Sequence, residues 1–216
     1  MPAADRADFD VPHASEAVVA LAQRGEVRRY RKGTLLIQEG DQGDTLFIIL
    51  AGRLRAFSVG ERDREITYGV YGAGEYLGEI SLDGGPRSAS VITLEASRCA
   101  VVTRRTLETF IAERPAFAFE LLAKVIRRAR SATHSARQLA LNDVYGRLKL
   151  LLDSLALAQA DGTRVLSERL THQEMANRLG CSREMVSRLM KDLERGEYLV
   201  ANMRGLALLR PLPTRW

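Results

Sequence analysis

One run of residues, from Leu77 to Val91, carries groups that could bind a phosphorylated ligand. Gly78 and the glycines at 84 and 85 would let backbone N–H groups approach an anion closely, because glycine adopts tight turns and has no side chain. Arg87 adds a planar cation that can donate two parallel hydrogen bonds to a phosphate, and Ser88 adds a hydroxyl donor. The segment predicts a binding site for one cyclic phosphate.

Glu79 is the unusual member of this run, because a carboxylate repels phosphate. Acidic residues accept hydrogen bonds from ribose hydroxyls in other nucleotide sites. With Glu79 as the sugar acceptor, the ligand would be a nucleotide. The alternative is a glycine turn between two strands that carries a surface arginine.

A second set of residues has the pattern of a DNA-binding helix pair. Thr171 and Glu174 form a capping box that starts a helix over 172–179, and Gly180 suits the left-handed residue that ends it. Ser182 caps a following helix over 183–195. Two helices joined by a short turn with glycine predict a helix-turn-helix.

The second helix of this pair exposes polar residues on the side away from its apolar positions. Arginine matches the O6/N7 edge of guanine and glutamate accepts from cytosine N4, so this face could read bases in double-stranded DNA. The alternative is a solvated charged face supported by pairs four residues apart. The candidate DNA-binding residues are Arg183, Glu184, Ser187, Arg188 and Lys191.

The secondary structure expected to position these residues changes along the chain, from strands to helices. A short helix is expected over 15–22, and short strand-like runs separated by Gly, Asp or Pro turns predict a small β sandwich or barrel. These runs cover 27–30, 34–37, 45–50, 54–59, 65–70, 88–93 and 98–103. A helix around 107–111 follows, and Pro115 ends it or starts the next one.

A long helix is then expected over 116–141. Its apolar residues recur at alternating spacings of three and four, which is the heptad seam of a coiled coil and predicts a parallel homodimer. The seam consists of Leu122, Val125, Ala129, Ala132, Ala136 and Leu139. The alternative is an amphipathic helix that lies on its own β domain.

After a hinge at Asn142 and Asp143, helix is expected to resume over 144–158 and a polar loop to cover 159–163. Residues 198–200 and 206–209 are expected to form the hairpin of a wing.

The composition narrows the protein classes. The formal charge of +5 is compatible with nucleic acid. No apolar run is long enough for a membrane span and no secretory signal is present, so a cytoplasmic protein without membrane contact is expected. Cys99 and Cys181 are far apart and the three histidines lack ligand spacing, so no metal, haem or iron–sulfur cluster is expected.

Three stretches resemble the Crp-Fnr family of bacterial regulators, which includes the cyclic-AMP receptor. Residues 77–91 resemble its phosphate-binding cassette, residues 39–52 resemble the preceding turn and strand, and residues 180–189 resemble its recognition helix. The resemblance implies an α+β chain: a cyclic-nucleotide-binding β roll over 1–114, a dimerisation helix and hinge over 115–142, and a winged helix-turn-helix over 143–216.

The resemblance also implies roles for individual residues. Gly78, Glu79, Arg87 and Ser88 would contact the ligand, with cyclic AMP the first choice. Arg128 would face the ligand and pair with Glu79. The residues implied to read a TGTGA-like half-site of a palindromic DNA site are Arg183, Glu184 and Arg188, and those implied to touch phosphates are Thr171 and Ser182. RNA polymerase would be a protein partner.

Three departures from the family limit this transfer. The cassette is shorter than that of the cyclic-AMP receptor. Ala132 and Thr133 stand where that receptor has two adjacent hydroxyls against adenine, so one base contact is missing. Met185 replaces a hydroxyl that touches phosphate. Cyclic GMP, cyclic di-GMP or no nucleotide therefore remain alternatives, and a regulatory subunit of an enzyme is the alternative from another class.

Overall fold

The computed structural model describes residues 9, 11–60, 64–160, 162–202 and 205–216. Within them the chain forms two compact units, and each is described by itself. The first contains Met1–Ser58 and Thr67–Arg130, and the second contains Val59–Ile66 and Ser131–Trp216. The long helix α3 (Ala116–Leu141) contributes to both.

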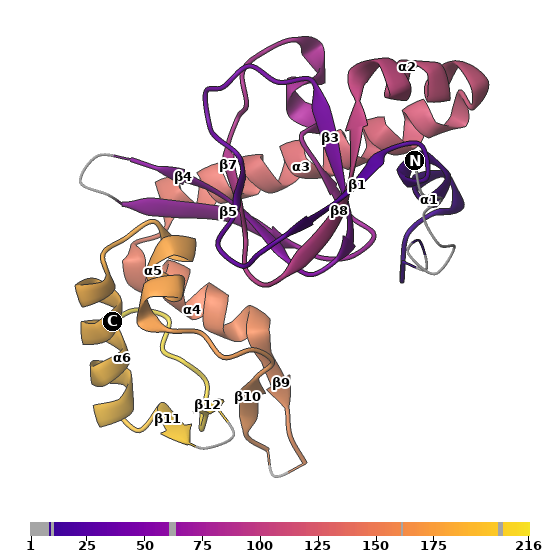
Figure 1. The fold of residues 1–216 in the computed structure, drawn as a ribbon. Coiled ribbons are helices and arrows are strands. Elements are labelled where there is room, and N and C mark those ends of the chain that lie inside the picture. Colours follow the sequence, from indigo (N-terminus) through magenta and orange to yellow (C-terminus); the bar gives the residue numbers. More distant parts are fainter. Residues whose placement is uncertain (1–8, 10, 61–63, 161, 203–204) are drawn as a thin grey trace. The chain divides into compact units, whose positions relative to one another are not determined.

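The first unit is a β roll of two four-stranded antiparallel sheets, as the strand-like runs predict (Figure 1). One sheet has the order β1-β8-β3-β6 and the other β2-β7-β4-β5. The strands are β1 (Glu26–Tyr30), β2 (Leu35–Ile37), β3 (Thr45–Ala51), β4 (Leu54–Val59), β5 (Glu65–Tyr71), β6 (Tyr76–Leu77), β7 (Ser90–Thr93) and β8 (Ser97–Thr103).

Two cores fix the position of β3 inside this roll. Its residues alternate between the core shared by the two sheets, where Phe47 and Ile49 lie, and the core under the helices, where Leu46 and Ile48 lie. Because both faces are covered, the strand is an apolar run and not an alternating one.

The helices of this unit are α1 (Glu16–Ala22), α2 (Arg104–Glu113) and the start of α3. Ser15 and Thr103 cap the first two through their hydroxyls. Phe110 of α2 and Phe117 of α3 meet edge to face with centroids 5.3 Å apart. Phe117 is buried, whereas the residues of α3 that follow it are half-buried or exposed.

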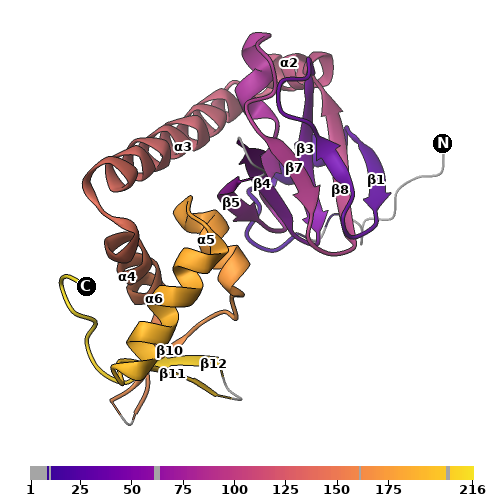
Figure 2. The same ribbon diagram turned by 90° about the vertical axis from the view of Figure 1, so that its left-hand side faces the viewer.

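The second unit contains a winged helix-turn-helix, together with the last residue of β4, the start of β5 and the end of α3. The elements of the winged helix-turn-helix are α4 (Val144–Leu155), β9 (Ala156–Ala158), β10 (Arg164–Leu166), α5 (His172–Leu179), α6 (Arg183–Arg195), β11 (Leu199–Asn202) and β12 (Gly205–Leu208). Figure 2 shows α5 and α6 beside one another, with strands β10, β11 and β12 at one end of α6. These strands belong to a sheet of order β11-β12-β10-β9. The expected hairpin is present, and residues 203–204 of its turn lie outside the described residues.

The local signals at the helix ends are confirmed. Thr171 and Glu174 make both bonds of the capping box, Gly180 has φ +64°, and Ser182 caps α6. Asp143 caps α4. The expectation that helix continues to residue 158 is wrong: α4 ends at Leu155, and the next three residues pair with β10. Among the described residues, no helix has both the length and the apolar character that a membrane span needs.

Candidate functional site: a phosphate cassette and a DNA-reading helix

The cassette backbone is built on two left-handed glycines. Gly78 has φ +96° and Gly84 has φ +95°, and they flank the 3-10 helix η3 (Glu79–Asp83). A Cβ at Gly78 would lie 2.5 Å from the Thr45 carbonyl oxygen and 2.8 Å from Arg87 Nη1. Glycine is therefore required here for both conformation and space.

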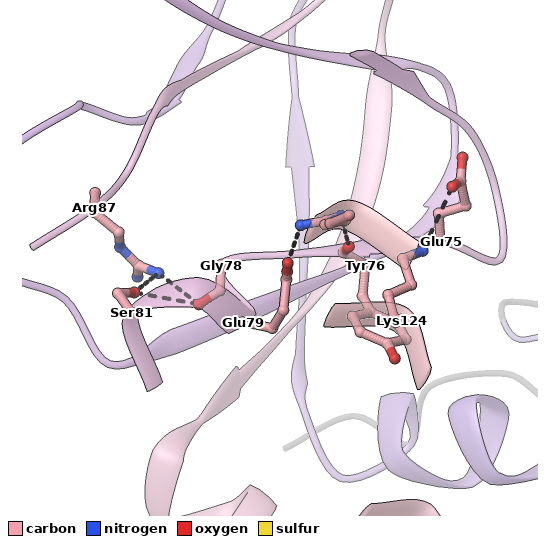
Figure 3. Close-up of polar contacts among 8 residues, drawn as sticks. Glu75, Tyr76, Gly78, Glu79, Ser81, Arg87 and Lys124 are labelled. Atoms are coloured by element: carbon pink, nitrogen blue, oxygen red, sulfur yellow. Dashed lines mark hydrogen bonds and ion pairs between the residues drawn. The ribbon is translucent and has the colours of Figure 1, made fainter. Parts of the chain in front are cut away.

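Arg87 lies inside this loop, only 7 % exposed. Its Nη1 donates to the Gly78 carbonyl (3.1 Å) and to Ser81 Oγ (2.8 Å), and Nη2 donates to Thr45 Oγ1 (2.9 Å). Figure 3 shows Arg87 reaching across to Gly78 and Ser81. Burial lowers the pKa of the guanidinium, although the group remains a cation. These contacts occupy three of its five N–H donors, and the other two have no partner among the described residues.

Glu79 has a fully buried side chain that points away from Arg87 (Figure 3). Its Oε1 accepts from Arg128 Nη1 of α3, as the family resemblance implies. Its Oε2 is buried and has no hydrogen-bond partner among the described residues. A buried acceptor without a donor is costly, and a ligand hydroxyl would satisfy it.

Arg128 is held on three sides. Besides Glu79, its Nη2 donates to the Tyr76 carbonyl (2.9 Å), and its guanidinium carbon lies 4.9 Å from the centroid of the Tyr71 ring. The Tyr71 ring is neutral at ordinary pH, and burial raises the pKa of its hydroxyl further. The arginine is thus fixed by a carboxylate, a carbonyl and an aromatic face.

A second ion pair joins the same strand region to α3 one helical turn earlier. Lys124 Nζ lies 3.4 Å from Glu75 Oε1 and 4.6 Å from the centroid of the Tyr76 ring (Figure 3). Burial lowers the pKa of Lys124, and burial raises the pKa of Tyr76 to about 12. Glu75, Tyr76 and Lys124 were missed in the sequence, because no local pattern marks a contact between residues 49 positions apart.

These residues fit a cyclic nucleotide. Arg87 offers N–H donors to a phosphate, and Glu79 Oε2 offers an acceptor to a sugar hydroxyl. The structure brings together Gly78, Glu79, Arg87 and Arg128, whereas the Ser88 side chain is exposed. Ala132 and Thr133 follow Arg128 by about one turn of α3 and are also exposed. Their role toward a ligand stays a prediction.

The second candidate site is the outer face of α6. Val186, Leu189, Met190 and Leu193 are buried, as expected, while Arg183, Glu184, Arg188 and Lys191 are exposed and Ser187 is half-buried. Hydrogen bonds to its own backbone amide and to the Ser182 side chain lower the pKa of Glu184, and the charge of Arg183 acts in the same direction, so the carboxylate is an acceptor. Arg188 Nη2 lies 3.2 Å from Met185 Sδ, so the departure at position 185 places a thioether beside a candidate base reader.

The two hydroxyls implied to touch DNA phosphates already act as helix caps. Thr171 Oγ1 donates to Glu174 Oε2 (2.8 Å), and Ser182 Oγ accepts from the Met185 amide (3.2 Å). Their position at the first turns of α5 and α6 matches the phosphate-facing end of such helices. A phosphate contact at either residue stays a prediction.

The heptad seam lies on an exposed face of α3. All six seam residues are exposed in the single chain, with Leu122 at 52 % and Leu139 at 44 %. Phe119 and Ile126 on the same helix are exposed as well. Large apolar side chains along one helix face are typical of a surface that another chain covers.

The comparisons with known proteins agree with this geometry. Residues 27–114 match the cyclic nucleotide-binding domain, and residues 169–196 match the bacterial regulatory proteins of the crp family. A CRP-like cAMP-activated global transcriptional regulator of Mycobacterium tuberculosis is 32 % identical over 182 residues, which cover 82 % of this chain and 80 % of the relative.

One more relative and one solved structure are similar to most of this chain. The cAMP-activated global transcriptional regulator CRP of Haemophilus influenzae is 30 % identical over 78 % of this chain and 77 % of its own length. The solved structure of the c-di-GMP responsive global regulator CLP of Xanthomonas campestris superposes with a TM-score of 0.78, at 24 % identity, and covers 90 % of this chain and 99 % of that one.

Fold and site together define a transcriptional regulator that joins a cyclic-nucleotide-binding domain to a DNA-binding helix-turn-helix, and not an enzyme. The chain belongs to the Crp family of bacterial regulatory proteins.

Proposed function

We propose that this chain is a homodimeric regulator whose binding to a palindromic DNA site is controlled by a cyclic nucleotide. The nucleotide-binding part of this proposal rests on two buried side chains that lie on one short loop. Arg87 has N–H donors left for a phosphate, and Glu79 has an oxygen left for a ribose hydroxyl.

Cyclic AMP is the first choice, because relatives of 32 % and 30 % identity are named as cAMP-activated. Cyclic di-GMP is the second candidate, because CLP, whose fold matches over most of both chains, is described as responsive to it. Ala132 offers no hydroxyl to adenine, so a weak preference of cyclic AMP over cyclic GMP is expected.

Calorimetry with cyclic AMP, cyclic GMP and cyclic di-GMP tests the ligand. Arg87→Ala should abolish the heat of binding and the ligand response, because phosphate loses its fixed cation, while affinity for random DNA stays unchanged. Arg31→Ala, at an exposed position of the same unit, is the control. No heat and no thermal shift with any nucleotide would leave a nucleotide-independent regulator.

The DNA-binding part of the proposal is that the exposed face of α6 contacts base edges. Arg183→Ala should lose about 1–3 kcal/mol of discrimination at one guanine of a selected palindromic site, TGTGA-like in its half-sites. Lys191→Ala should instead weaken all sequences alike and reduce the salt dependence. Equal losses on specific and random DNA for Arg183→Ala would remove it as a base reader. RNA polymerase remains the expected protein partner, and the cytoplasm the expected location.

A further inference from the structure

Arg147 of α4 donates hydrogen bonds to backbone carbonyls at the ends of two other helices. Its Nη1 bonds the carbonyl oxygen of Asn142 (2.8 Å), the residue directly after α3. Its Nε bonds the carbonyl oxygen of Leu179 (3.1 Å), the last residue of α5. All three residues belong to the second unit. One guanidinium therefore joins the end of the long helix to the turn that leads into α6.

Both carbonyls are in positions that need such a donor. The last carbonyls of a helix have no partner within the helix, and a cation is favoured near them by the helix dipole. At the end of α5, the amides of Gly180 and Cys181 both bond to the Ala176 carbonyl, and neither bonds to Leu179. Among the described residues, Arg147 is the donor found for the Leu179 carbonyl.

A packing contact supports the same joint. Leu139, on the last turn of α3, has its Cδ2 3.7 Å from the position that a Cβ at Gly180 would occupy. The last turn of α3 therefore lies against the turn between α5 and α6. The hydrogen bonds of Arg147 and the nearness of Leu139 to Gly180 are therefore two separate observations on the same pair of segments.

We infer that Arg147 is a positioning residue for DNA reading, which fixes the orientation of α6 relative to the end of α3. The inference rests on the proposed function, because in a dimer formed through α3 this orientation determines the distance between the two reading helices. Lysine could not replace the arginine. A planar fork reaches two acceptors in different directions, whereas an ammonium on a single flexible stem is a point charge.

The property to measure is the preference for one distance between the two DNA half-sites, called here the spacing preference. A residue that merely stabilises the fold would not change this preference. A palindromic duplex is first selected from random DNA with the wild-type chain. Affinities are then measured for that duplex and for versions with one or two base pairs added between the half-sites. The variant is Arg147→Lys, and the matched control is Arg137→Lys, at an exposed position of α3 outside the seam. Melting temperature and affinity for random DNA are recorded for each.

We expect Arg147→Lys to bind the selected duplex about tenfold more weakly, the loss expected for one charge-assisted hydrogen bond. Its affinity for the lengthened duplexes should fall much less, so that its spacing preference flattens. Random-DNA affinity should match that of Arg137→Lys, and the melting temperature should fall only by the few degrees expected for one lost hydrogen bond.

An unchanged spacing preference, or an equal loss at every spacing, would overturn the inference. If Arg147→Lys fails to fold, Arg147→Gln, which keeps a neutral N–H donor, must show the flattened preference or the inference fails. If no palindrome can be selected at all, the proposed function fails first, and the inference fails with it.

Discussion

Gly43 lies directly against the guanidinium of Arg87: a Cβ at position 43 would stand 2.6 Å from Arg87 Nε and 2.9 Å from Cζ. The same loop binds the arginine backbone, because the Arg87 amide donates to the Asp41 carbonyl (2.8 Å) and the Gly40 amide donates to the Arg87 carbonyl (2.9 Å). The turn before β3 thus packs against Arg87, the residue proposed to bind phosphate, and fixes its position.

Gly43→Ala should therefore weaken cyclic-nucleotide binding without unfolding the roll. The added methyl group would force Arg87 out of its position, and we expect an affinity loss of about tenfold or more, typical of a misplaced charge-assisted contact. Titration calorimetry measures it. Gly72→Ala is the control, because a Cβ there meets no atom within 4 Å. Equal affinities for the two variants would show that Gly43 does not position Arg87.

Val125→Glu should convert the dimer into monomers. Two copies of the seam would place glutamates together in an apolar interface, where unpaired charges are strongly unfavourable. His134→Glu adds the same side chain at an exposed position on the opposite side of the heptad and should leave the dimer intact. Sedimentation velocity distinguishes the two. A dimer that persists in Val125→Glu would place the interface elsewhere.

Tyr76 should make the first unit less stable at high pH. Burial raises its pKa to about 12, whereas a tyrosine in an unfolded chain titrates near 10. The neutral phenol is thus favoured by folding, and this stabilisation is complete below about pH 10 and is lost as the pH rises toward 12. Lys124, whose pKa burial lowers, acts in the opposite sense.

The comparison of wild type with Tyr76→Phe separates the phenol from Lys124. Urea unfolding should show Tyr76→Phe gaining stability relative to wild type above about pH 10. Near neutral pH the change should be small, because the Tyr76 hydroxyl has no hydrogen-bond partner among the described residues. Tyr68→Phe, at a site that is 54 % exposed, is the control. Parallel curves for wild type and Tyr76→Phe would refute the assignment.

Trp216→Ala should destabilise the winged helix. The indole lies 5.8 Å from the Tyr145 ring and 5.7 Å from the Tyr198 ring, centroid to centroid, and the Tyr145 hydroxyl donates to the Pro213 carbonyl (2.8 Å). Each aromatic pair is worth about 0.5–1.5 kcal/mol beyond area burial. Unfolding followed by circular dichroism should show the loss, and Trp216→Phe should restore part of it. Equal stability of all three chains would contradict the prediction.

The helix-turn-helix could be predicted almost to the residue, because its signals are local. Thr171, Gly180 and Ser182 each make their capping contact within a few residues. The prediction of helix at 156–158 was wrong because the structure there depends on a contact that is not local. Ala-Leu-Ala favours helix in isolation, but pairing with β10 across the loop overrides that preference.

Part of the candidate site could also be predicted, because some of its residues lie close together in the sequence. Gly78, Glu79 and Arg87 are close in sequence and form a recognisable run. Thr45 contacts Arg87 across 42 positions, and Lys124 contacts Glu75 across 49. Such contacts depend on how the roll closes and how α3 lies on it, which no single sequence window contains.

The two ion pairs that join the residues on either side of β6 to α3 have matching intervals in sequence: Glu75 and Glu79 are four residues apart, and so are their partners Lys124 and Arg128. A slide of the helix by less than one turn, about 5.4 Å, would break both pairs at once. A slide by a full turn would bring Lys124 beside Glu79, or Arg128 beside Glu75. The two ion pairs therefore favour the present position of α3 over positions shifted by less than one turn, because such a shift would leave Glu79, whose side chain is fully buried, without its cation.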